Sequence, residues 1–537
     1  MKFYFLRFFF VLLLEAICFA SCGVNATHVG TNIEVFKKEN ITYVIKRVID
    51  LEGKTLTIPA GCTLKFKGGR FSNGTVKGNN TKVIYKDVIF DKVTIEGSWN
   101  VPVITTSMFS DSQKDILFNL SQLQDENVNN KIYIEKGDYI VNTNKRRFVF
   151  QVKSNAIVQI DGNIELEPQT NATYYNGYYI IYAVSASNVK LCGSGSLVGD
   201  KDRSLIKSEY GHAICLIGCN NVEISGLHFS HQNGDAIAVS LGCENIVVDN
   251  IFIEDYYRNG ISVVDCKMFK WTNSIVKNGG GTPPHAAIDI EPNDGYEVKT
   301  ANVDNIKIEG CGVGLSGYVK KNIGDTKVGK VSFSNITILD SKVEPVAIIG
   351  FDNLTIKGLT ISNTSQNVKY LMKILDCNDV ELSRLVVNNI IECDNYPLYL
   401  NNKHLTLSDC ILKSPKLFSF HFSNARITRC KFIYDSFLHT SKEIPTKKIF
   451  FDKCTFVGPF LMYPDDVSFI NCKFLKPMHG SNDVIRFEKP YSNTSVSSEL
   501  HLEGNFFEND KGETRLMINP QIKATTVNNV VRMFSVR

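Results

Sequence analysis

The sequence has no long run of charges of one sign. Its 59 basic and 55 acidic side chains nearly balance, the formal net charge is +4, and only 21% of residues are charged. Proteins that bind the phosphate backbone of DNA or RNA usually show a basic patch or stripe, and none stands out here. We therefore expect no nucleic-acid partner.

Long apolar runs are also missing after the N-terminus, so no later segment is expected to span a membrane. Residues 1–22, MKFYFLRFFFVLLLEAICFASC, place Lys2 and Arg7 before a short apolar run and then small residues, which is the layout of a secretory signal. The FASC segment that ends at Cys22 resembles the lipobox of bacterial lipoproteins. This resemblance implies secretion across the inner membrane and a lipid anchor at Cys22, which makes the protein an outer-membrane or cell-surface lipoprotein. An ordinary cleaved signal is the alternative.

Disulfide and metal-binding patterns are absent, although the chain contains 15 cysteines. No CxxC pair and no cluster of cysteine with histidine appears, which argues against a zinc-type site. Several cysteines instead follow strand-like phrases at a position that Leu or Ile occupies elsewhere: Cys311, Cys410, Cys430, Cys454 and Cys472. Cysteine that replaces leucine behaves as a small apolar residue, so we expect buried thiols here and no disulfide framework.

A short phrase comes four times between residues 212 and 291, as HAICL, DAIAV, NGISV and AAIDI. Its isoleucines, Ile214, Ile237, Ile261 and Ile288, follow one another at steps of 23, 24 and 27 residues. Repeats of this length made of short alternating strands are typical of a β-solenoid, in which each turn, or rung, stacks on the previous one. Later phrases extend the repeat, with aligned positions Ile338, Ile356, Leu382, Leu407, Ile427, Phe451 and Phe469.

The chain before the repeat contains two further parts. Residues 23–108 carry short β-branched runs between Gly, Asn and Pro, which predicts a β-rich region, either a small solenoid or a sandwich. Residues 111–123 begin with an aspartate and have leucine and isoleucine at helical spacing, which predicts a helix. The phrase IYIEKGDY, residues 132–139, follows this helix.

A helix that begins with aspartate and precedes such a phrase resembles the entry of pectin lyase-like right-handed parallel β-helix proteins. The resemblance implies an all-β chain. It also implies a right-handed parallel β-helix, or β-solenoid, over residues 109–537, with an N-terminal capping helix. A cap is physically needed because an open solenoid end exposes core and unpaired strand edges.

Alternation within the repeated strands separates inward from outward side chains. If the four isoleucines point inward, the residues that follow them, Cys215, Ala238, Ser262 and Asp289, form an outward column. Glu291 lies two residues after Asp289 on the same face, about 6–7 Å away along a strand. Small residues that lead to two carboxylates predict a shallow exterior trough. The carboxylates suit acid–base chemistry or calcium ligation, and a plain polar exterior strand is the alternative.

Other polar residues precede these strands. Asp235 begins its strand in one column with His212 and Asn259, where it could act as an acid or base, or hold a corner by bonding the backbone. Arg258 and His285 share the next column, where they could bind a carboxylate and transfer protons. The candidate catalytic residues are Asp235, Arg258, His285, Asp289 and Glu291, and the candidate substrate-binding residues are Tyr256, Tyr257, Asn259 and His212.

The resemblance implies a polysaccharide ligand, but the chain departs from the polygalacturonase pattern. The GD pair that ends at Asp235 resembles the Asp-Asp rung of those enzymes with only its second aspartate, and RNG (258–260) stands where Gly-His-Gly would be. We expect a glycoside hydrolase or a uronate polysaccharide lyase acting in the trough, with calcium as a cofactor left open. The alternative is a non-catalytic glycan-binding or structural protein of the cell surface.

Overall fold

The computed structural model describes residues 26–170, 177–205, 207, 209–319, 326–362, 368, 370–388, 398–414, 423–434, 446–475, 484–487, 498–509 and 515–533. Contacts divide the chain into two compact units, Met1–Ile132 and Tyr133–Arg537. The predicted signal peptide and Cys22 lie outside the described residues. Within the described residues, no helix has the length and apolar character needed to cross a membrane.

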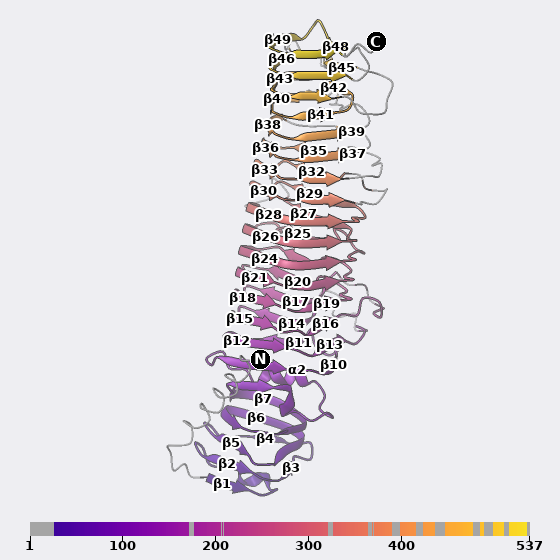
Figure 1. The fold of residues 1–537 in the computed structure, drawn as a ribbon. Coiled ribbons are helices and arrows are strands. Elements are labelled where there is room, and N and C mark those ends of the chain that lie inside the picture. The colour runs from indigo at the N-terminus through magenta and orange to yellow at the C-terminus, as the bar shows by residue number, and fades with distance from the viewer. Residues whose placement is uncertain are drawn as a thin grey trace, which may run out of the picture. The chain divides into compact units, whose positions relative to one another are not determined.

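The first unit is a set of parallel strands (Figure 1). Its sheet runs in the order β1-β2-β5-β6-β3, and β4 and β7 also pair with β6. All of these pairings are parallel, which favours the solenoid over the sandwich. The elements are β1 (Ala26–Val29), η1 (Ile33–Val35), β2 (Thr42–Ile45), β3 (Val48–Asp50), β4 (Thr55–Thr57), β5 (Thr63–Phe66), β6 (Arg70–Ile84), β7 (Phe90–Asn100), β8 (Val103–Thr105), η2 (Thr106–Met108), α2 (Ile116–Gln122) and β9 (Asn130–Ile134).

The predicted helix is present as α2, which is shorter than expected and belongs to the first unit. Asn119 Oδ1 accepts the N–H of Ile95 at 3.0 Å. Just before the helix, Gln113 accepts the N–H of Val93 at 2.8 Å and donates to its carbonyl oxygen at 3.0 Å. Because these backbone groups lie along β7, the α2 segment covers a strand edge that would otherwise be unpaired. Asp115 holds the N-cap position, but its side chain makes no capping bond.

The second unit stacks its strands in three ladders of parallel strands. The chain visits the first, second and third ladder in turn in each rung, and parallel crossovers of this kind are right-handed in almost all proteins. The third ladder runs β11 (Phe148–Val152), β14 (Tyr178–Val184), β17 (Gly211–Ile217), β20 (Ile237–Ser240), β23 (Ile261–Val263), β25 (Ala286–Ile290), β27 (Val313–Tyr318), β29 (Glu344–Ile349), β32 (Met372–Leu375) and β35 (Leu398–Asn401), and later rungs place β42 (Phe460–Met462), β45 (Val484–Phe487) and β48 (Arg515–Ile518) in a separate sheet.

The other two ladders share three long strands, β24 (Cys266–Lys277), β26 (Glu297–Glu309) and β28 (Lys327–Leu339). The first ladder also contains β12 (Ala156–Ile160), β15 (Ser187–Cys192), β18 (Asn220–Ser225), β21 (Glu244–Asp249), β30 (Asn353–Lys357), β33 (Asp379–Ser383), β36 (His404–Ser408), β38 (Ser423–Thr428), β40 (Thr446–Asp452), β43 (Pro464–Ile470), β46 (Glu499–Glu503) and β49 (Lys523–Val527). The second contains β10 (Asp138–Val141), β13 (Asn163–Leu166), β16 (Ser196–Val198), β19 (His228–Ser230), β22 (Phe252–Glu254), β31 (Thr360–Ser362), β34 (Val386–Asn388), β37 (Ile411–Ser414), β39 (Lys431–Tyr434), β41 (Thr455–Val457), β44 (Lys473–Leu475), β47 (Phe506–Asn509) and β50 (Val530–Met533).

Asparagines fix the corner at which the chain enters the first ladder. Asn155, Asn188, Asn221 and Asn245 all have positive φ, between 54° and 58°, a conformation that asparagine tolerates better than most residues. The side-chain amides of the last three donate to the Oδ1 of the asparagine one rung before, at 3.0, 3.3 and 2.7 Å. This row of amides holds successive rungs in one register.

The predicted repeat register is confirmed by strand pairing. Ile214, Ile237, Ile261 and Ile288 are direct partners in the third ladder, and all four are fully buried. The late alignment from Ile356 to Phe469 is also confirmed. The five cysteines predicted to replace leucine are buried and free.

One step of the predicted alignment is wrong. Ile356 pairs with Phe333 in the first ladder, whereas Ile338 pairs with Ile361 in the second. Both Phe333 and Ile338 lie on β28, which serves two ladders and has inward apolar residues in each half. A pattern with period two therefore does not show which half of β28 continues which ladder.

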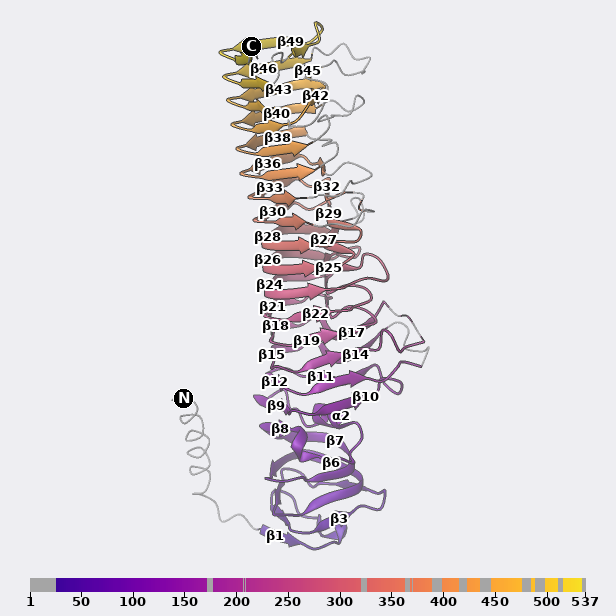
Figure 2. The same ribbon diagram turned by 45° about the vertical axis from the view of Figure 1, so that its right-hand side comes forward.

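The connections that lead into the third ladder are longer than the corners beside the first. They run from Val198 to Gly211, from Ser230 to Ile237, from Glu254 to Ile261 and from Lys277 to Ala286. Figure 2 shows connections that project from one side of the second unit. His212, Asp235, Arg258, Asn259 and His285 all lie in these connections or directly after them, at the beginning of third-ladder strands.

Candidate functional site

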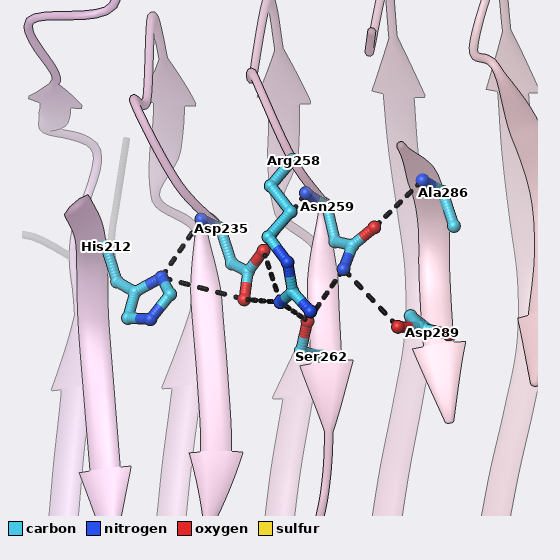
Figure 3. A network of polar contacts seen from close by, with 7 residues as sticks. All are labelled: His212, Asp235, Arg258, Asn259, Ser262, Ala286 and Asp289. Atoms are coloured by element: carbon cyan, nitrogen blue, oxygen red, sulfur yellow. Dashed lines mark hydrogen bonds and ion pairs between the residues drawn. The ribbon is translucent and has the colours of Figure 1, made fainter. Parts of the chain in front are cut away.

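A chain of hydrogen bonds crosses four neighbouring rungs where the third-ladder strands begin (Figure 3). His212 Nδ1 accepts the N–H of Asp235 at 3.0 Å, and Asp235 Oδ1 accepts the N–H of Asn259 at 3.0 Å. Asn259 Oδ1 in turn accepts the N–H of Ala286 at 2.9 Å. None of the four residues is more than 7% exposed. The predicted shared column of His212, Asp235 and Asn259 is thus confirmed, and each side chain satisfies a buried backbone donor in the next rung.

Arg258 forms an ion pair with Asp235. Its Nη1 lies 3.0 and 3.3 Å from the two carboxylate oxygens and 3.3 Å from Ser262 Oγ. Burial lowers the pKa of Arg258, but the negative charges of Asp235, Asp289 and Glu209 outweigh burial and raise it. The guanidinium therefore stays charged and Asp235 is its fixed carboxylate partner. Removing one member of such a buried pair leaves the other charge uncompensated.

His212 is a neutral imidazole. Its Nδ1 accepts a backbone N–H, so the proton of the ring lies on Nε2. Burial lowers the pKa of His212, and the nearby Asp235 carboxylate offsets this only in part. The 3.6 Å approach of Nδ1 to Asp235 Oδ2 is accordingly not a charged pair.

Asp289 is the carboxyl group with the most unusual protonation in this network. It is only 2% exposed on β25, and Asn259 Nδ2 donates to its Oδ2 at 3.5 Å. Burial raises the pKa of Asp289 to about 7 and the charge of Glu291 adds to the rise, while a hydrogen bond with Ser316 and the charge of Arg258 oppose it. Asp289 is thus a carboxylic acid that holds its proton near neutral pH beside a second, half-buried carboxyl group, Glu291. General acids are tuned in this way.

The predicted outward column exists, but it is not an open trough. Cys215, Ala238, Ser262 and Asp289 are direct partners in adjacent strands. Each is between 2% and 9% exposed, so the expectation of a solvent-lined floor is wrong. At Ser262, larger side chains of the neighbouring column lie over the small one, because both Arg258 and Asn259 bond to its hydroxyl group.

His285 lies away from the polar network. Its ring covers Gly312, where an added Cβ would lie 2.2 Å from the ring. Its Nδ1 faces the carbonyl oxygen of Gly281 at 3.5 Å. Within the described residues, no hydrogen bond or ion pair joins this ring to Arg258 or Asp289, so the network does not include His285, and its role in proton transfer stays a prediction.

Tyr256 and Tyr257 differ in burial. Tyr256 is 0% exposed and passes directly over Gly279, so the expectation that it binds substrate at the surface is wrong. The residue is core because the chain turns inward there, as its close approach to Cys311 also shows. Tyr257 is half-buried against Gly281, and Lys207 Nζ lies 5.7 Å from its ring centroid, so it stays a candidate.

Alternation along the sequence missed a row of aromatic rings on the preceding rungs. We call Phe148, Tyr182, Tyr179 and His212 the aromatic row. Successive ring centroids lie 5.6, 5.0 and 5.9 Å apart, with interplanar angles of 20°, 11° and 11°. The signal was hidden because Ile180 and Ile181 of β14 are both buried, which breaks the period of two between the two tyrosines. The phrase YYIIY was the available clue.

No metal ligand set accompanies these residues. Among the residues that the structure describes, no group of three or more His, Cys, Asp or Glu side chains could hold a metal ion.

Comparisons with known proteins find similarity at low identity. No family model matches the sequence. The chain is 27% identical over 188 residues to the uncharacterized protein YclG of Bacillus subtilis, and the match spans 30% of this chain and only 32% of that protein. Similar solved structures include the tailspike protein of E. coli bacteriophage HK620 in complex with a pentasaccharide, with 10% identity, 78% of this chain and 76% of that chain covered, and a TM-score of 0.44. An exopolygalacturonase from Thermotoga maritima has 12% identity, 75% and 85% coverage, and a TM-score of 0.31.

The strand order, the parallel register and the three ladders decide the fold class. The chain has a right-handed parallel β-helix fold.

Proposed function

We propose that the protein is a glycoside hydrolase that acts on a polysaccharide lying across the outward face of the third ladder. One observation carries this proposal: Asp289 is a buried outward carboxyl group with a pKa of about 7, and Glu291 lies two residues further on, just past the end of β25. Glycoside hydrolysis needs one carboxylic acid to protonate the leaving oxygen and one carboxylate to act on the other side of the bond.

The chain's own residues divide this work. Asp289 holds the proton for the glycosidic oxygen and Glu291 supplies the second carboxylate. Asp235 and Arg258 neutralise each other and fix Asn259, whose amide reaches both Ser262 and Asp289. They are positioning residues in this account.

Hydrolysis is favoured over uronate elimination by the state of Arg258. A lyase needs a cation that is free to hold the uronate carboxylate. The Arg258 guanidinium is already paired with Asp235 and contacts both oxygens of that carboxylate. A lyase would need that pair to break.

A panel of neutral and acidic polysaccharides tests the proposal. We expect the purified protein to release new reducing ends from one of them without the absorbance of unsaturated uronates. Asp289→Asn should abolish this release, whereas Asp294→Asn, the same change at an exposed loop position, should leave it unchanged. Absorbance that rises together with reducing ends would show a lyase.

A non-catalytic glycan-binding protein is the second candidate. The near-complete burial of Asp235, Asn259 and Asp289 favours it, because a buried polar network can serve the fold alone. Retention of a glycan on an affinity gel with no new reducing ends, unaffected by Asp289→Asn, would select this function.

We also propose that the protein is secreted and anchored through Cys22. The composition and order of residues 1–22 support this location. Metabolic labelling with a fatty acid should mark the wild-type protein in its membrane fraction and not Cys22→Ala. Equal labelling of both would overturn the anchor.

A further inference from the structure

One ring of the aromatic row, Tyr182, stands in register with Asp289. Tyr182 pairs directly with Cys215, which begins the same outward column that continues through Ala238 and Ser262 to Asp289. Four rung steps therefore separate Tyr182 from Asp289. At about 4.8 Å for each step, this is roughly 19 Å along the solenoid.

The side chains between these two ends are small. Cys215, Ala238 and Ser262 are each at most 9% exposed, and Arg258 and Asn259 bond to Ser262, so a ligand between the two ends lies over these covering side chains. A ligand that touches both ends must run along the axis of the solenoid and must be longer than one or two sugar units. The geometry thus gives a direction and a minimum length to the bound chain.

The aromatic row is built to hold a ligand without rearrangement. Its rings are already stacked on one another, so their rotamers are fixed before anything binds. Tyr179 and Tyr182 are half-buried, and their hydroxyl groups provide polar tips on apolar bodies. Rigid, amphipathic tyrosines contribute contact area at a low cost in side-chain entropy.

A cation lies beside the row. Arg147 is exposed, and its carbonyl oxygen accepts the N–H of Tyr179 at 2.7 Å, which places it at the adjoining position one rung earlier. Burial raises the pKa of Tyr179 and of Tyr182, and the positive charge of Arg147 lowers both. The guanidinium therefore lies near both rings. Arg147 adds hydrogen-bond donors to this end of the ligand path.

We infer that the aromatic row, whose Tyr182 lies four rungs from Asp289, is a remote subsite that binds the distant end of an oligosaccharide and makes the protein prefer long chains. This inference rests on the proposed function, because it takes Asp289 as the reacting end. Binding energy from a remote subsite makes a long ligand better than a short one, and a contribution shared equally by ground and transition state appears in KM.

The test compares ligands that differ only in length. Size-fractionated oligogalacturonides and xylo-oligosaccharides, from disaccharide to octasaccharide, are offered to the wild-type protein, to Tyr182→Ala and to Tyr133→Ala. Tyr133 is an exposed tyrosine on β9, outside the third ladder, and is the matched control. Thermal unfolding checks that each variant is folded.

We expect kcat/KM of the wild type to rise with length until the ligand spans the path. Tyr182→Ala should lose about tenfold on the octasaccharide, mainly in KM, and stay within about twofold of wild type on the shortest substrate that is cleaved. Tyr133→Ala should behave as wild type. Equal losses at all lengths, or no dependence on length in the wild type, would overturn the inference while leaving the hydrolase in place.

If no oligosaccharide is cleaved, the hydrolase proposal fails and the remote subsite is judged by binding. Calorimetric Kd values should then fall with ligand length in the wild type, and this advantage should disappear in Tyr182→Ala. Absence of binding to every length of both series would overturn the remote subsite as well.

Discussion

Where the third-ladder strands begin, side chains take the place of backbone carbonyl groups as hydrogen-bond acceptors. His212, Asp235 and Asn259 each accept the N–H of the residue that follows in the next rung. A buried N–H without an acceptor costs more than its hydrogen bond contributes when formed. The same residues that look catalytic in the sequence therefore also hold neighbouring rungs together.

Asn259→Ala should destabilise the protein by about 1–3 kcal/mol, because it leaves the buried N–H of Ala286 without its acceptor. Urea unfolding followed by circular dichroism measures the change. Asn302→Ala, at an exposed position on β26, should stay within about 0.5 kcal/mol of wild type. A loss at Asn259 no larger than at Asn302 would show that the bond chain contributes nothing.

Asp289 should make stability depend on pH. Burial raises its pKa from 3.8 to about 7, so between these values the folded protein binds a proton that the unfolded chain has released. Stability then falls as pH rises from about 4 to about 7, by up to about 4 kcal/mol. Asp289→Asn should remove this slope. Parallel wild-type and variant curves over that pH range would contradict the raised pKa.

Alternation in the sequence correctly placed Asp289 outward but did not reveal its burial. The covering groups, Arg258 and Asn259, come from another rung and lie 30 or more residues away in the chain. Period-two reasoning reports which face a residue occupies and says nothing about which side chain lies above it. For the same reason alternation does not reveal that the ring of Tyr256 is buried.

At the scale of elements, stacked aromatic side chains bind late strands together. Phe432, Phe456, Phe474 and Phe507 lie on β39, β41, β44 and β47 of the second ladder, with successive centroids 5.1, 5.0 and 4.9 Å apart. All four are buried. A sequence repeat that keeps phenylalanine at the same position of each rung produces such an in-register row.

Phe456→Ala should cost about 3–5 kcal/mol, because it removes a fully buried ring from the middle of this row. Chemical denaturation gives the value. Ile411→Ala is the control: Ile411 lies on β37 of the same ladder but is 47% exposed, so its loss should be within about 0.5 kcal/mol. Equal losses at the two sites would contradict a packed row.

Elements were predictable where one strand serves one ladder. The isoleucine phrases aligned correctly because each lies on a short strand with a clear inward side. The alignment slipped at β28, which spans two ladders, and the aromatic row was missed at β14, where two successive isoleucines are buried. Both failures occur where the period of two is interrupted or doubled.

At the scale of the second unit, each rung contacts mainly its neighbours, so disturbances should stay local. Amide hydrogen exchange followed by mass spectrometry can show this. In Phe456→Ala we expect faster exchange in β38 to β44 and unchanged exchange in β14 to β23. Acceleration that reaches β14 to β23 would mean that the whole solenoid opens as one cooperative body.

The fold class could be predicted from the sequence because each rung of a solenoid corresponds to one repeat of the sequence. The site did not follow as fully, because its function depends on how protons are shared among groups on four different rungs. Asp289 has its raised pKa through burial and through Glu291, and neither can be weighed without the structure.

The pH dependence of hydrolysis tests the central claim that Asp289 is the general acid. On a polysaccharide that the wild type cleaves, kcat/KM should fall as pH rises through about 7, where Asp289 loses its proton. Asp289→Asn should lower kcat/KM by about 10²–10⁴-fold at pH 6, and Asp294→Asn should follow the wild-type curve. A wild-type rate that stays flat from pH 5 to pH 9, or an Asp289→Asn variant within about threefold of wild type, would contradict the assignment.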